Sequence, residues 1–202
     1  FLADFTSRVA QTIDLSIKKN GASTQEHASV LLDIAELYTI YGNYSIAESY
    51  ILEAKSTLEK SDQLEDNLSA KIQLSTAKIY SGQGFYNKAL DFIENIDQYF
   101  SSRAVSKETY VDSESGKLKT RKLDAKDVQD RLQDYATLII LKAETMGKQG
   151  DIFNADSEFA KNSLWIKKNL GGQQIKYVEN NYLWGKMLET NGVLDLKDAV
   201  KE

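Results

Sequence analysis

The chain has 202 residues and a formal net charge of −5 at pH 7, and it contains no proline and no cysteine. The missing cysteines exclude a disulfide scaffold and a cysteine nucleophile, and the single histidine, His27, excludes multi-histidine metal sites. The acidic balance argues against nonspecific nucleic-acid binding, and no window approaches about 18 consecutive apolar residues. We therefore expect a soluble globular protein without membrane insertion, and the composition fits the cytoplasm and the periplasm equally.

Apolar residues recur every three or four positions along almost the whole chain, which is the period of an α-helix. The absence of proline, which breaks helix interiors, favours the same structure. The predicted helices span residues 2–19, 25–41, 44–60, 63–82, 86–101, 125–148, 152–169, 174–190 and 194–201. His27 is expected at the surface or in the first turn of the second helix, without a catalytic role.

Residues 102–124 interrupt this series of helices. Two short β-like runs, at 109–111 and 117–120, flank a turn that contains Gly116, which is typical of a β-hairpin. A loop without regular structure is the alternative. The insertion carries the densest basic cluster of the chain beside a tyrosine: Tyr110, Lys117, Lys119, Arg121 and Lys122. These residues are candidate contacts for an acidic partner surface, or else they belong to a solvated loop.

The helices form pairs that share one internal pattern. A small residue is followed by glycine seven positions later and, in three pairs, by alanine twelve positions later, as in Ala35, Gly42 and Ala47. The four turn glycines are Gly42, Gly84, Gly150 and Gly192. Their spacings are 42, 66 and 42 residues, and 66 equals 42 plus an insertion of 24. Glycine suits a left-handed helix cap, so each unit is predicted to be an antiparallel helix hairpin that stacks on its neighbours.

This pattern resembles the tetratricopeptide repeat (TPR) family, in the subtype with a long 42-residue period that is similar to kinesin light chains and bacterial arrays. The matching units are 28–61, 70–103, 136–169 and a partial unit at 178–202, while 1–20 resembles the second helix of a preceding unit. The resemblance implies an all-α, right-handed solenoid over 1–202, with the insertion at 102–124 as a hairpin or loop. Because the array starts and stops within a unit, we expect a part of a larger protein.

The resemblance also implies a concave groove lined by the first helix of each unit. Its fifth positions are apolar, namely Leu32, Leu74, Ile140 and Tyr182, and its ninth positions alternate in charge, namely Glu36, Lys78, Glu144 and Lys186. Lys71 completes the set of candidate groove residues. An apolar row beside alternating charges suits a bound peptide. Alternatively, the charges pair between neighbouring helices and hold the stack together.

No constellation of residues indicates an enzyme, a metal site or a cofactor, and we expect none. The resemblance favours a protein–protein interaction scaffold that binds a peptide or protein partner in the groove. One alternative is a regulatory or sensor module that controls a fused effector domain, for example a caspase-like protease. Another is an interaction through the basic insertion. The sequence leaves the partner and the oligomeric state open.

Overall fold

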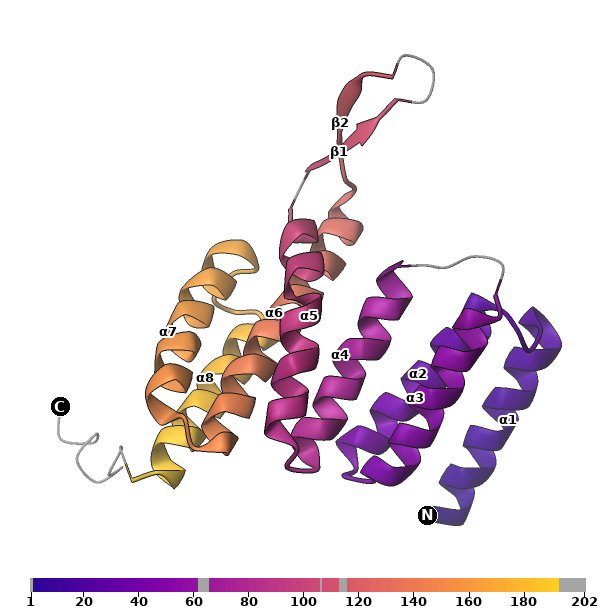
Figure 1. The fold of residues 1–202 in the computed structure, drawn as a ribbon, viewed down its shortest axis with the longest axis horizontal. Helices are drawn as coiled ribbons and strands as arrows, with labels where there is room; N and C mark the ends of the chain where they lie inside the picture. Colours follow the sequence, from indigo (N-terminus) through magenta and orange to yellow (C-terminus); the bar gives the residue numbers. More distant parts are fainter. Residues whose placement is uncertain (1, 62–65, 106, 113–115, 193–202) are drawn as a thin grey trace. The chain divides into compact units, whose positions relative to one another are not determined.

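The computed structural model describes residues 2–61, 66–105, 107–112 and 116–192 (Figure 1). These residues form helices and one β-hairpin. The helices are α1 (Leu2–Asn20), α2 (Gln25–Ile40), α3 (Tyr44–Glu59), α4 (Asp66–Gly82), α5 (Tyr86–Arg103), α6 (Ala125–Gln149), α7 (Ile152–Asn169) and α8 (Ile175–Thr190). The predicted all-helical character is confirmed. The predicted helix at 194–201 and the predicted start of the fourth helix at residue 63 lie outside the described residues.

The chain divides into two compact units, Phe1–Ile93 and Glu94–Glu202. In the first unit, α1 packs against α2, and α2, α3 and α4 pack against one another. In the second unit, α6, α7 and α8 pack against one another in the same pairwise way. Each unit therefore contains a helix hairpin with the next helix packed against both of its members, as the repeat pattern predicts.

The short turns between paired helices share one backbone geometry. Gly42, Gly84 and Gly150 have positive φ angles of 73°, 86° and 95°. In each turn, the amide of the residue after the glycine donates to the carbonyl five residues earlier, at 2.9, 2.8 and 3.0 Å respectively. Side chains other than glycine rarely adopt this conformation, so the predicted glycine caps are confirmed.

The core of each unit lies where the helices cross. Ala35, Ala77 and Ala143, the small residues of the repeat pattern, are all fully buried. Gly185 occupies the fourth such position, but a Cβ atom built there meets no neighbouring atom within 4 Å. Close helix packing therefore explains the three alanines and does not explain Gly185.

Buried polar side chains join successive helices in the second unit. Asn162 of α7 donates from Nδ2 to the carbonyl of Ile139 in α6 at 2.8 Å. Asn180 of α8 likewise donates to the carbonyl of Phe159 in α7 at 3.1 Å. Hydrogen bonds of this kind give the buried NH2 group of each asparagine a partner and fix the register of one helix on the next.

His27 plays a similar part in the first unit. Its ring Nδ1 lies 3.0 Å from the Oγ of Ser16 in α1, and its backbone amide donates to the Oγ1 of the N-cap residue Thr24. The predicted position in the first turn of α2 is confirmed. The predicted surface exposure is wrong, because α1 covers the ring and leaves it buried.

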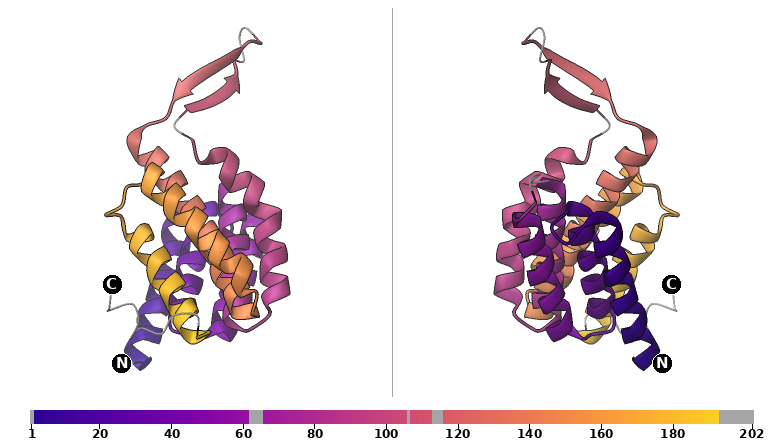
Figure 2. Two further views of the ribbon diagram at one scale, coloured as in Figure 1. Left: turned by 90° about the vertical axis from the view of Figure 1, so that its left-hand side faces the viewer. Right: turned by 90° about the vertical axis from the view of Figure 1, so that its right-hand side faces the viewer.

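The insertion forms an antiparallel β-hairpin of β1 (Lys107–Val111) and β2 (Leu118–Lys122). Figure 2 shows it projecting from the ends of α5 and α6. At its base, Leu123 is buried, and the side chain of Asp124 caps α6 by accepting from the amide of Asp127 at 2.8 Å. Of the two structures that the sequence leaves open for this segment, the hairpin is the one that forms.

Candidate functional site

The helix sets α2–α4 and α6–α8 correspond through a constant offset. The offset between the turn glycines Gly42 and Gly150 is 150 − 42 = 108 residues. The same offset relates Glu36 to Glu144 and Lys78 to Lys186, all of which the sequence places at the predicted groove. The two sets therefore offer two versions of one site, built on the first helix of each hairpin.

In the first unit this site is closed by polar contacts. One carboxylate oxygen of Glu36 accepts from the Ser75 hydroxyl at 2.8 Å and from the Lys78 ammonium at 3.0 Å. This pair joins α2 to α4, which confirms charge pairing between neighbouring helices at Glu36 and Lys78. Lys71, two turns before Lys78 on the same face of α4, contributes a further positive charge near Glu36.

The apolar row predicted beside these charges is mostly absent from the surface. Leu32, Leu74 and Ile140 are only 5%, 4% and 2% exposed, because they pack in the interior of the helix layers. The expectation that they offer apolar surface to a partner is wrong. Of the four fifth positions, only Tyr182 lies at the surface, at 65% exposure, on the same face of α8 as Val178.

The closed site fixes the ionisation of Glu36. Burial alone raises the pKa of this carboxyl, but the charge of Lys78 and the hydrogen bonds from Lys78 and Ser75 outweigh burial. The pKa of Glu36 therefore lies below its ordinary value. A carboxyl with a depressed pKa in the folded state stabilises the fold above its unfolded pKa, and that contribution is lost as the pH falls through the folded pKa.

We accordingly predict that Glu36→Gln lowers the free energy of unfolding by about 0.2–1 kcal/mol at pH 7, since the pair is partly solvated. The difference between wild type and variant should shrink as the pH falls below the ordinary range of a glutamate. Urea unfolding followed by circular dichroism at pH 7 and pH 3 measures this difference in the free energy of unfolding. The control is Glu53→Gln, the same change at an exposed position of α3, which should lower the free energy of unfolding at pH 7 less than Glu36→Gln does. A difference that grows at pH 3 would contradict the assignment.

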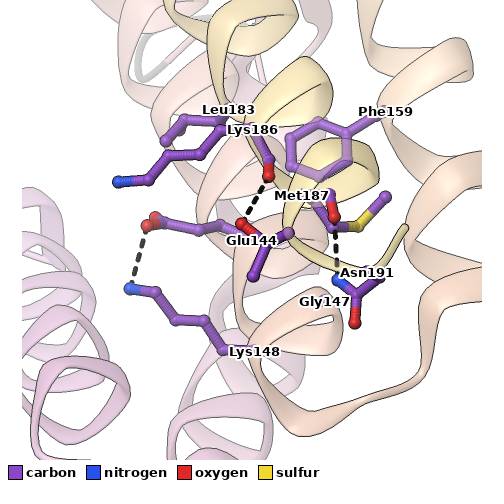
Figure 3. A pocket seen from close by; sticks show the side chains of 9 residues that line it. Glu144, Gly147, Lys148, Phe159, Leu183, Lys186, Met187 and Asn191 are labelled. Atoms are coloured by element: carbon purple, nitrogen blue, oxygen red, sulfur yellow. Dashed lines mark hydrogen bonds and ion pairs between the residues drawn. The ribbon is translucent and has the colours of Figure 1, made fainter. Parts of the chain in front are cut away.

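In the second unit the corresponding site is open. A pocket of about 220 Å³ lies between α6, α7 and α8 (Figure 3). Phe159, Leu183 and Met187 provide its apolar lining, and the charged side chains of Glu144, Lys148 and Lys186 also line it. Gly147, Thr190 and Asn191 complete the lining.

The charges around the pocket are unevenly compensated. Glu144 pairs with Lys148 on its own helix at 2.8 Å, as Figure 3 shows. Lys186 is exposed, and it makes no ion pair with any residue that the structure describes. The pocket therefore combines an apolar interior with one uncompensated positive charge.

Three residues at the site differ between the two repeats. Leu183 stands where the first unit has Ser75, because 183 − 108 = 75, so Glu144 has no hydroxyl to bind. Gly147 stands where the first unit has Thr39, and the Met187 side chain packs directly over this glycine, since a Cβ atom there would lie 2.7 Å from the Met187 Sδ. Lys148 replaces Ile40 and takes up the carboxylate of Glu144.

The structure of the hairpin shows where the basic residues of the insertion lie. Lys119, Arg121 and Lys122 lie in β2 and are exposed, and Lys117 is an exposed residue just before this strand. Lys119 pairs with Asp112 at 2.6 Å. Tyr110 lies opposite Lys119 in β1, but its side chain is outside the part of the chain whose side chains are described.

No family model matches the chain, and no curated protein matches it either. Among the described residues, no group of histidine, aspartate and glutamate side chains is arranged to hold a metal ion. None of the helices in the described part has the length and apolar character needed to cross a bilayer. The features that the geometry offers for binding include the pocket on α6, α7 and α8, the hairpin, and a more polar pocket of about 280 Å³ in the first unit between the N-terminal ends of α2 and α4, beside Lys71.

Proposed function

We propose that the chain is a protein–protein interaction module, built as a TPR-like right-handed solenoid, that binds a peptide segment of a partner protein at the pocket on α6 and α8. The observation that carries the proposal is that this site is open in the second unit, while its counterpart in the first unit is closed by Glu36, Ser75 and Lys78. The regular offset, the glycine caps and the packing of successive helices support the TPR-like architecture.

The lining indicates which peptide the pocket would accept. Its apolar interior, formed by Phe159, Leu183 and Met187, suits one aliphatic or aromatic side chain, which acts as the anchor of a peptide interface. The uncompensated ammonium of Lys186 favours an acidic residue near that anchor. Tyr182, one turn before Lys186 on α8, offers exposed aromatic surface for the rest of the peptide.

Selection from a random peptide library displayed on phage tests the proposal. We expect enriched sequences that combine an apolar residue with a nearby aspartate or glutamate. Fluorescence polarisation of a labelled synthetic peptide then gives its affinity for each variant. Lys186→Glu should weaken binding about tenfold, since a favourable charge contact becomes repulsive. Lys168→Glu, an equal charge change at an exposed position of α7, is the control.

A second variant gives the pocket of the second unit the residues that stand at the same positions in the first unit. It combines Gly147→Thr, Lys148→Ile, Leu183→Ser and Met187→Ile, each of which copies the residue 108 positions earlier. Circular dichroism should show that the variant remains helical. Undiminished peptide binding by this folded variant, or no enrichment of any sequence by the wild type, would refute the proposed function.

A further inference from the structure

The two faces of the β-hairpin differ in composition. Residues that oppose each other in an antiparallel pair point to the same side of the sheet, and successive residues alternate in side. The register therefore places Lys107 with Lys122 and Thr109 with Thr120 on one face, next to Leu118. We call these five residues the lysine face. The other face takes Lys119 and Arg121 of β2.

The two faces also differ in charge compensation. On the other face, the ion pair between Lys119 and Asp112 neutralises one cation, and Arg121 also has an interaction partner. On the lysine face, Lys107 and Lys122 oppose each other, both are exposed, and neither has an ion pair among the described residues. Like charges in direct opposition destabilise a sheet. An anionic group held between the two ammonium groups would relieve this repulsion.

The lysine face is also unsupported by the rest of its unit. A two-stranded hairpin is at best marginally stable in water on its own. The side chains of β2 are all exposed, including Leu118 at 74%, and Figures 1 and 2 show the strands extending beyond the ends of α5 and α6. A partner that covered this face would stabilise the hairpin and bury Leu118.

Charge favours a polypeptide segment as the occupant. Residues 107–122 contain five basic residues (Lys107, Lys117, Lys119, Arg121 and Lys122) and three acidic ones (Glu108, Asp112 and Glu114), for a net charge of +2. Since the net charge of the whole chain is −5, the net charge of the residues outside 107–122 is −7. That remainder repels an extended polyphosphate such as a nucleic acid. A short acidic segment with alternating side chains needs only the local cations, hydroxyls and leucine.

We propose that the lysine face binds an extended acidic segment of a partner protein, with carboxylates between Lys107 and Lys122 and an apolar side chain on Leu118. This interaction is separate from the pocket on α6 and α8, so either proposal can fail without the other. The two threonines, Thr109 and Thr120, offer hydroxyl donors to the segment between its acidic and apolar ends.

The test measures the affinity of a fluorescein-labelled ten-residue peptide with glutamate at every second position and threonine or valine between. We expect Lys107→Glu/Lys122→Glu to weaken its binding at least about tenfold. The matched control, Lys117→Glu/Lys119→Glu, makes the same change in net charge on the other side of the hairpin, and should weaken binding less than about twofold.

A peptide with glutamine in place of glutamate should not bind. Nuclear Overhauser contacts between Thr109 and Thr120 report whether the strands stay paired in each variant.

Four outcomes would overturn the proposal. One is equal weakening by the two double variants, which would make net charge alone responsible. Another is tighter binding of single-stranded DNA than of the peptide, which would assign the face to a polyphosphate. A third is undiminished binding by Lys107→Glu/Lys122→Glu with the strands paired. The last is the absence of saturable binding of the glutamate peptide to the wild type. The lysines would then serve to prevent the edges of the hairpin from pairing with strands of other molecules.

Discussion

Replacing Phe159 with alanine should lower the free energy of unfolding by about 3–5 kcal/mol. Phe159 is 0% exposed and packs with Ala143, Ala155 and Met187. Removing its ring leaves a cavity beside the pocket that the surrounding helices cannot fill without moving. Urea unfolding followed by tryptophan fluorescence measures the effect, because both tryptophans, Trp165 and Trp184, lie in the second unit.

The same helix provides the control for this substitution. Phe153 also lies in α7, but it is 84% exposed. Phe153→Ala removes the same number of atoms and should change the free energy of unfolding by less than about 0.5 kcal/mol. Similar losses for the two variants would contradict the packing described for α7.

Gly82→Ala should destabilise the first unit by about 1–3 kcal/mol, although alanine is the better helix former. Gly82 is the last residue of α4, and a Cβ atom there would overlap the aromatic ring of Tyr44, the first residue of α3. The ring would have to move out of its place against the core cluster of the first unit. Urea unfolding followed by circular dichroism at 222 nm measures the loss.

A double-mutant cycle isolates this contact. In a Tyr44→Ala background the obstacle is gone, so Gly82→Ala should stabilise the protein by about 0.5–1 kcal/mol through helix propensity alone. The sign of the effect should therefore reverse between the two backgrounds. An equal loss in both would show that Gly82 is required for a reason other than the ring of Tyr44.

The features that could be predicted from the sequence are the local ones. Gly42, Gly84 and Gly150 mark helix ends because a left-handed cap depends on a single residue and its immediate neighbours. The hairpin follows in the same way from short strands around Gly116. These signals suffice for the order of the elements and for their bounds to within a few residues.

The candidate site depends on packing between helices, which is not a local property. Leu32 and Leu74 occupy positions that the TPR resemblance assigns to a groove, yet the neighbouring helices bury them. The pocket arises where Leu183 and Gly147 replace Ser75 and Thr39 of the first unit. Aligning the two repeats shows these substitutions, but only the packed helices show the pocket that they line.

The side-chain bonds that join helices also determine the order in which the chain can fold as it is synthesised. In the described residues, the bond from Lys78 to Glu36 spans 42 residues, and the bond from Asn180 to Phe159 spans 21. Contacts this close in sequence favour rapid folding and allow a nascent chain to fold from its N-terminus. Helices α1 to α4 can therefore begin to pack as soon as they have been synthesised.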